Sequence, residues 1–209
     1  MTFDEQIKLE GLIDRLKQFI GARPRNPTAH YNLGLAFMQK GQIEDAEFAF
    51  KMALELDPDM VEAHINLGGL YLKQKKLDEA IAENEKALAI NPRAILAYNN
   101  IGFARMLQDR LEESAQAFEK AIELDPELIP AQLSLARVLE RQGDLDGVIA
   151  RYEKILEKDD NFALAHYNLA LAYLEKGDPN KASEHYRQAV RLKYPVDPEV
   201  GRKIEAARG

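Results

Sequence analysis

The chain has 209 residues, of which 46% are hydrophobic and 30% charged, so it can bury a core and a fully disordered chain is excluded. It contains no cysteine, which excludes disulfides, thiolate metal sites and cysteine nucleophiles. The formal net charge of −7 argues against general attraction to nucleic acid or anionic membranes.

No apolar run approaches the roughly 18 residues of a membrane-spanning helix. The first residues, Met-Thr-Phe-Asp-Glu, lack the basic and apolar order of a signal peptide. We therefore expect a cytoplasmic protein without direct membrane insertion, unless a signal or anchor has been removed. The length allows one large domain or two small ones.

The first predicted helix covers residues 7–20, where apolar residues recur at helical spacing. No partner helix precedes it. We therefore expect residues 1–26 to form an N-terminal capping helix, equivalent to half a repeat. Its apolar residues are Ile7, Leu9, Leu12, Ile13, Leu16, Phe19 and Ile20.

A period of 34 residues follows the first helix. Glycine, proline and alanine each recur at this spacing, which chance does not produce in one frame. The period predicts five units, 27–60, 61–94, 95–128, 129–162 and 163–196. The recurring residues are Gly34, Gly68 and Gly102; Pro58, Pro92 and Pro126; and Ala29, Ala63, Ala97, Ala131 and Ala165.

Each unit is predicted to contain two helices. In the first unit, Leu33 and Phe37 lie on one helical stripe, and Gly41 is expected to end that helix. Phe50 lies on the stripe of the second helix, which should end before Pro58. Glycine at position 34 suits a close helix crossing.

This pattern resembles the tetratricopeptide repeat family, whose repeat is a helix–turn–helix of 34 residues. The resemblance implies an all-α, right-handed superhelical solenoid of five repeats. Unit four matches least well. In unit one the signature positions are His30, Leu33, Gly34, Phe37, Ala46, Phe50, Ala53 and Pro58.

Two positions depart from the family pattern. Asn84 stands where an aromatic residue is expected in unit two, and Arg105 does so in unit three. We expect the two side chains to lie near each other, either as a satisfied polar pair or as a ligand contact or hinge.

Residues 197–209 are expected to form a C-terminal capping helix. Val200, Ile204 and Ala207 have helical spacing, and Pro198 suits a first turn. Such a helix would cover the exposed side of the last repeat, as solenoids require.

The sequence predicts no catalytic, cofactor-binding or metal-binding residues. His30, His64 and His166 occupy one position of different units, which indicates a repeated structural role. No nucleophile, phosphate-binding or dinucleotide motif is present. We therefore expect a protein that is not an enzyme and has no cofactor.

The resemblance implies a concave groove built mostly from the first helices. Asn32, Asn66, Asn100 and Asn168 share one groove position, with Ser134 in unit four. An asparagine amide offers both a donor and an acceptor, so such a ladder could grip a peptide backbone. The large sugar-transferase member of the family is similar in this respect. The alternative is that these asparagines bond only locally.

Apolar groove positions are expected to supply side-chain pockets. Arg137 and Arg141, one helical turn apart, could read a ligand carboxylate or pair with Glu140 and Asp144. The apolar positions are Tyr31, Leu35, Met38, Ile65, Leu72, Phe103, Met106, Leu133, Tyr167, Leu171 and Leu174.

The expected function is a non-enzymatic scaffold that binds a peptide or protein segment, extended or helical, in this groove. One alternative is a regulatory subunit or fragment of a larger enzyme or assembly system. Another is a module that self-associates through its N-terminal edge or its groove.

Overall fold

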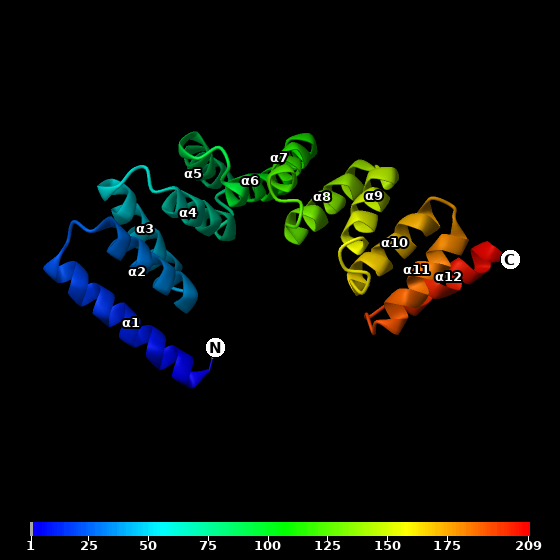
Figure 1. Ribbon diagram of the computed structural model, residues 1–209, viewed down its shortest axis with the longest axis horizontal. Coiled ribbons are helices and arrows are strands. Elements are labelled where there is room, and N and C mark those ends of the chain that lie inside the picture. The colour runs from blue at the N-terminus through cyan, green and yellow to red at the C-terminus, as the bar shows by residue number, and fades with distance from the viewer. Residues whose placement is uncertain (1) are drawn as a thin grey trace. The chain divides into compact units, whose positions relative to one another are not determined.

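The computed structural model describes residues 2–209, which form twelve α-helices and no strand (Figure 1). The all-α fold class is confirmed. Residue 1 of the expected capping segment lies outside the described part. The helices are α1 (Phe3–Ala22), α2 (Pro27–Lys40), α3 (Ile43–Leu56), α4 (Val61–Lys73), α5 (Leu77–Ile90), α6 (Ile95–Leu107), α7 (Leu111–Leu124), α8 (Ile129–Gln142), α9 (Leu145–Leu156), α10 (Ala163–Glu175), α11 (Pro179–Arg191) and α12 (Pro198–Arg208).

The chain divides into two compact units, Met1–Asp109 and Arg110–Gly209. Unit 1 therefore contains α1 to α6, and unit 2 contains α7 to α12. The boundary lies between α6 and α7, inside the third 34-residue period. Each unit is described by itself below.

Unit 1 is built from helix hairpins. Helices α2 and α3 form one hairpin, α4 and α5 form the next, and α6 packs against both α4 and α5. Helix α1 lies along α2 (Figure 1) and buries Leu9 and Ile13 in the core that contains Phe37 and Phe50. A capping box fixes its start, because the Thr2 hydroxyl accepts from the Glu5 N–H and the Glu5 carboxylate accepts from the Thr2 N–H.

Unit 2 repeats this arrangement. Helices α8 and α9 form one hairpin, α10 and α11 form another, and α7 packs on α8. Helix α12 packs on α11, and its Val200 and Ile204 are buried in the cluster that contains Tyr152 and Leu169. The C-terminal helix therefore removes an apolar face of unit 2 from solvent.

The turn within each hairpin contains one residue with positive φ. The predicted end of the first helix at Gly41 is confirmed, since Gly41 is its left-handed C-cap. The same conformation recurs every 34 residues even where the residue is not glycine, so the fold imposes it. The residues are Gly41 (80°), Lys75 (60°), Asp109 (63°), Gly143 (76°) and Gly177 (82°).

The two helices of a hairpin cross closely at a glycine. A Cβ at Gly34 would lie 2.6 Å from the Phe50 ring, and one at Gly68 would collide with the side-chain nitrogen of Asn84. The neighbouring Gly69 is different, because a Cβ there would meet only Asn100, at 3.9 Å. Gly68 is thus required by packing, whereas Gly69 faces open space.

Asn84 is fully buried and is satisfied by residues other than Arg105. Its Nδ2 donates to the Ala80 carbonyl at 2.7 Å, and its Oδ1 accepts from Asn100 Nδ2 at 3.1 Å. Arg105 instead donates to Gln108 Oε1 at 3.2 Å. The expected Asn84–Arg105 pair is wrong because Asn100, on the next first helix, reaches Asn84.

The repeated histidine position holds the preceding turn. His64 Nε2 donates to the Pro58 carbonyl at 2.9 Å, and His166 Nε2 donates to the Asp160 carbonyl at 2.9 Å. Gln132 occupies the same position in unit four and bonds the Pro126 carbonyl at 3.0 Å. The predicted structural role of these histidines is confirmed.

The second ring nitrogen distinguishes the two histidines. His64 Nδ1 lies 2.6 Å from Glu83 Oε2, and this hydrogen bond raises the pKa of His64. His166 Nδ1 lies 3.0 Å from His185 Nδ1. Burial, followed by the charge of His166, lowers the pKa of His185.

The adjacent glycines of α4 should respond oppositely to a methyl group. Gly68→Ala should destabilise the fold by about 1–3 kcal/mol, because the buried Asn84 cannot move freely. Gly69→Ala should stabilise it by about 0.5–1 kcal/mol, because alanine costs less backbone entropy in a helix. Urea unfolding followed by circular dichroism measures both, and a loss of stability in Gly69→Ala contradicts the assignment of open space.

The stability contributed by His64 should fall as the pH rises. A raised folded-state pKa gives a contribution that is complete below the unfolded value, near 6.5, and is lost as the pH passes the folded value. His64→Gln keeps a donor for the Pro58 carbonyl, as Gln132 does for Pro126. Thermal unfolding of wild type and His64→Gln should therefore differ more at pH 6 than at pH 9.

His185 provides the control of opposite sign. Its folded-state pKa is lowered, so wild type should lose stability as the pH falls below the unfolded value near 6.5. His185→Phe keeps the stacking on Tyr173, whose ring centroid is 5.7 Å away. This variant should be less sensitive to acid than wild type, and equal sensitivity would remove His185 from the account.

Candidate functional site

A cleft of about 370 Å³ lies on the first-helix face of unit 1. Helices α2, α4 and α6 supply its walls, and the open position at Gly69 leaves the space above α4 free. Aliphatic side chains dominate the lining, two asparagines lie among them, and Lys73 adds one positive charge. The lining residues are Met38, Ile65, Asn66, Gly69, Leu72, Lys73, Leu96 and Asn100.

Both asparagines in the cleft use their amide nitrogens within the protein. Asn66 Nδ2 donates to the Glu62 carbonyl at 2.8 Å and to the Tyr31 hydroxyl at 3.1 Å. Asn100 Nδ2 donates to Asn84 Oδ1 at 3.1 Å and to the Ile65 carbonyl at 3.4 Å. These bonds tie each first helix to the preceding repeat.

The other two predicted ladder residues lie elsewhere. Asn32 is exposed and lines a separate cleft of about 240 Å³ between α1 and α2, beside Leu12 and Leu35. Asn168 belongs to unit 2, where its Nδ2 donates to the Tyr152 hydroxyl at 2.9 Å. The structure therefore brings Asn66 and Asn100 together in one cleft.

The partners Asn84 and Tyr152 were missed by sequence reasoning. Both lie on second helices, 16 residues before the asparagine that they bind, Asn100 and Asn168 respectively. This spacing of 16 is the signal that could have revealed them. It is hidden in unit one because Phe50 has no polar atom, so Asn66 turns to Tyr31.

The predicted apolar residues of unit 1 differ in exposure. Ile65 lines the cleft, and Phe103 is half-buried. The Tyr31 ring is half-buried, with its centroid 5.7 Å from that of Phe50. Met106 is only 8% exposed and thus offers little surface to a ligand. Leu35 belongs to the cleft between α1 and α2.

The predicted residues of unit 2 form a more polar surface. Arg137 and Arg141 are exposed on α8. Glu140 accepts a hydrogen bond from the Tyr152 hydroxyl at 3.4 Å, while burial raises the pKa of Glu140. The nearby charge of Glu175 raises that pKa further, and the charge of Arg137 lowers it. The arginines therefore share this surface with carboxylates.

Tyr167 and Leu171 lie on α10. The Tyr167 hydroxyl accepts a hydrogen bond from the Asp197 N–H at 3.3 Å, and its ring centroid lies 5.3 Å from that of Tyr194. Tyr167 therefore helps to anchor the segment before α12. Leu171 is 37% exposed.

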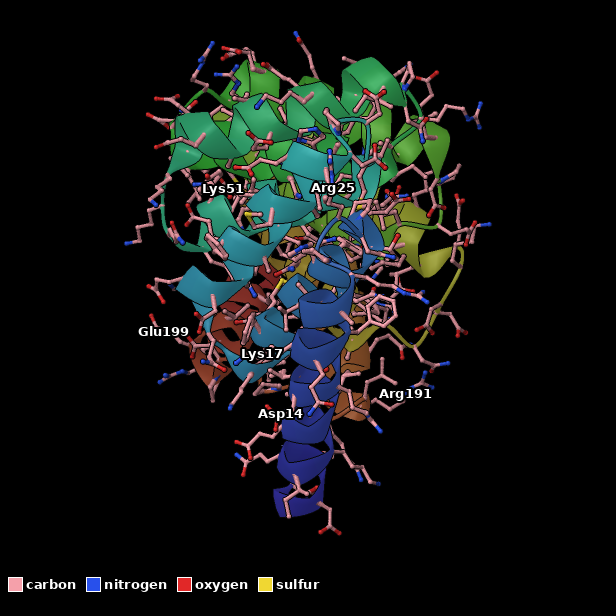
Figure 2. The ribbon with its side chains drawn as sticks, turned by 90° about the vertical axis from the view of Figure 1, so that its left-hand side faces the viewer. Asp14, Lys17, Arg25, Lys51, Arg191 and Glu199 are labelled. Atoms are coloured by element: carbon pink, nitrogen blue, oxygen red, sulfur yellow. The ribbon has the colours of Figure 1, made fainter. Side chains whose placement is uncertain are left out.

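A larger cleft of about 610 Å³ lies between the second helices α3 and α5. Leu54, Ala89 and Ile90 line it, and the His64–Glu83 pair forms part of its wall. Its lysines are paired, since Lys51 bonds Glu47 and Lys86 bonds Glu83, each at 2.7 Å. Figure 2 labels Lys51 on α3, together with Asp14 and Lys17 on α1.

Within residues 2–209, no three histidine, aspartate or glutamate side chains gather to hold a metal ion. None of the helices described combines the length and the apolar character needed to cross a bilayer.

Helix hairpins repeated every 34 residues, with clefts on the first-helix face, define a helical-repeat scaffold for protein–protein interaction. The tetratricopeptide repeat family profile matches residues 27–60, 61–93, 95–128 and 163–193, and a second profile of the same repeat matches 129–154. The chain belongs to the tetratricopeptide repeat family. No catalytic family is indicated.

Solved structures agree with this assignment. MamA is 27% identical, with a TM-score of 0.72 over 77% of this chain and 94% of that chain. Pseudomonas aeruginosa pilF is 26% identical, with a TM-score of 0.70 over 82% and 78%. YrrB, described as a TPR protein with an unusual peptide-binding site, shares the fold at 21% identity, with a TM-score of 0.73 over 93% and 98%. No curated protein matches the chain.

The cleft asparagines should differ from Asn32 in their effect on stability. Asn100→Ala leaves the buried Oδ1 of Asn84 without its donor, so it should cost about 1–3 kcal/mol. Asn32→Ala alters an exposed side chain and should change stability by less than about 0.5 kcal/mol. Urea unfolding of both variants tests this, and equal small effects would contradict a structural role for Asn100.

Proposed function

We propose that this chain is a non-enzymatic scaffold that binds a peptide or protein segment on its first-helix face. The observation that carries the proposal is the unit 1 cleft, in which Gly69 leaves open space between Asn66 and Asn100. Apolar walls would hold ligand side chains, and the asparagines would contact the ligand backbone.

Exposed apolar side chains support this proposal. Leu96 is 56% exposed and Leu107 is 58% exposed, both on α6. A solvent-facing apolar wall is characteristic of an interaction surface. The proposed contact residues remain Asn32, Asn66, Asn100, Asn168, Tyr31, Leu35, Ile65, Phe103, Met106, Arg137, Arg141, Tyr167 and Leu171.

We also propose that five repeats over 27–196 lie between caps at 1–26 and 197–209. A second candidate function is self-association through α1. Its Ile7 is 53% exposed, and its Leu12 and Phe19 are each 40% exposed. These apolar side chains would suit a second copy of the chain.

The variant Gly69→Leu should block the cleft without unfolding the protein, because its side chain enters open space. Capture from lysate of the source cells, read by quantitative mass spectrometry, should recover a partner with wild type and lose at least about 90% of it with Gly69→Leu. Circular dichroism and thermal unfolding check that the variant is folded.

Ala89→Leu is the matched control, since Ala89 is exposed in the cleft between α3 and α5. Its partner recovery should equal that of wild type. Loss with Ala89→Leu but not with Gly69→Leu would move the site to the second helices. Recovery of a differently tagged copy of the chain would favour self-association.

A further inference from the structure

We infer that the unit 1 cleft recognises an extended segment by accepting hydrogen bonds from its backbone N–H groups. This inference rests on the proposed function and specifies the chemistry of the ligand. It follows from the orientation of two side-chain amides, Asn66 and Asn100, which the surrounding protein fixes.

The orientation of Asn66 is set by a backbone carbonyl. The Glu62 carbonyl lies 2.8 Å from the Asn66 side chain and can only accept a hydrogen bond. The atom facing it must therefore be Nδ2. The same nitrogen donates to the Tyr31 hydroxyl, which leaves Oδ1 as the remaining polar atom of the side chain.

The orientation of Asn100 is set in two steps. The Ala80 carbonyl, also an obligatory acceptor, fixes Nδ2 of the buried Asn84 at 2.7 Å. Oδ1 of Asn84 must then face Asn100, so Asn100 presents its own Nδ2 at 3.1 Å. The Ile65 carbonyl, 3.4 Å from the same nitrogen, requires the same orientation.

The two Oδ1 atoms remain for a ligand. Among the described residues no donor reaches Oδ1 of Asn66 or Asn100, and neither oxygen is among the buried unpaired atoms. The cleft asparagines thus offer acceptors alone. A ligand edge that presents carbonyl oxygens has no asparagine donor to meet.

An extended segment meets this requirement, whereas a helix does not. Helical N–H groups beyond the first turn are already bonded to carbonyls of the same helix. An extended chain keeps its N–H groups free, and they alternate between its two edges. The aliphatic walls at Ile65, Leu72 and Leu96 suit apolar side chains of the same segment.

Two substitutions of Asn66 separate an acceptor from mere packing. Asn66→Asp keeps an acceptor oxygen, and the Tyr31 hydroxyl can reverse to donate to it. Asn66→Leu has a similar size but no acceptor. Thermal unfolding establishes that both variants are folded before binding is measured.

The test uses a phage-displayed library of random linear 12-residue peptides selected on wild type, with Gly69→Leu as the counter-selection. One selected peptide is synthesised and methylated at each backbone nitrogen in turn. We expect methylation of one or two positions on one edge to weaken binding about tenfold, with the neighbouring positions tolerant. Asn66→Leu should weaken binding about 3- to 10-fold, and Asn66→Asp less than about threefold.

The failures of the two proposals are distinguishable. If no selected peptide loses binding to Gly69→Leu, the proposed function of the cleft is wrong. If peptides do depend on Gly69 but tolerate methylation at every nitrogen, or are helical when bound by NMR, the inference of N–H recognition is overturned. In that second case the proposed function stands.

Discussion

The close crossing of the two helices within each hairpin governs what the rest of this fold can do. At Gly68 there is no room for a side chain, and the residue that fills the crossing from the second helix is the buried Asn84. A buried amide has to be satisfied. Asn100 supplies the donor, so a packing requirement inside one repeat determines the hydrogen-bonding character of the next first helix.

The histidine position shows the same coupling between repetition and local variation. One ring nitrogen always bonds a turn carbonyl, as His64 and His166 do, and Gln132 can replace the imidazole there. The other nitrogen meets Glu83 in unit 1 and His185 in unit 2. The common bond maintains the repeat, while the variable one gives each unit its own dependence on pH.

The sequence was sufficient to predict the helices, their period and the turn at Gly41, because these depend on local spacing and on residues that favour one backbone conformation. Positive φ at Lys75 and Asp109 was not predictable from residue type. The positions of Asn66 and Asn100 on one face were predictable, but their bonds were not. Which amide atom faces the ligand depends on Asn84 and Tyr31, which lie on other helices. Nothing in the unbroken 34-residue period marked the division after Asp109.

The residue that faces the crossing glycine varies among the repeats, with phenylalanine at 50 and 118, asparagine at 84 and tyrosine at 152. Only the polar choices engage the asparagine that follows 16 residues later. Binding preference in this architecture can therefore evolve through a residue that never touches the ligand. A phenylalanine at 84 would release the amide of Asn100, and a groove that only accepts hydrogen bonds would become one that also donates them. New specificities would then arise from the interior of the repeat, with the exposed surface unchanged.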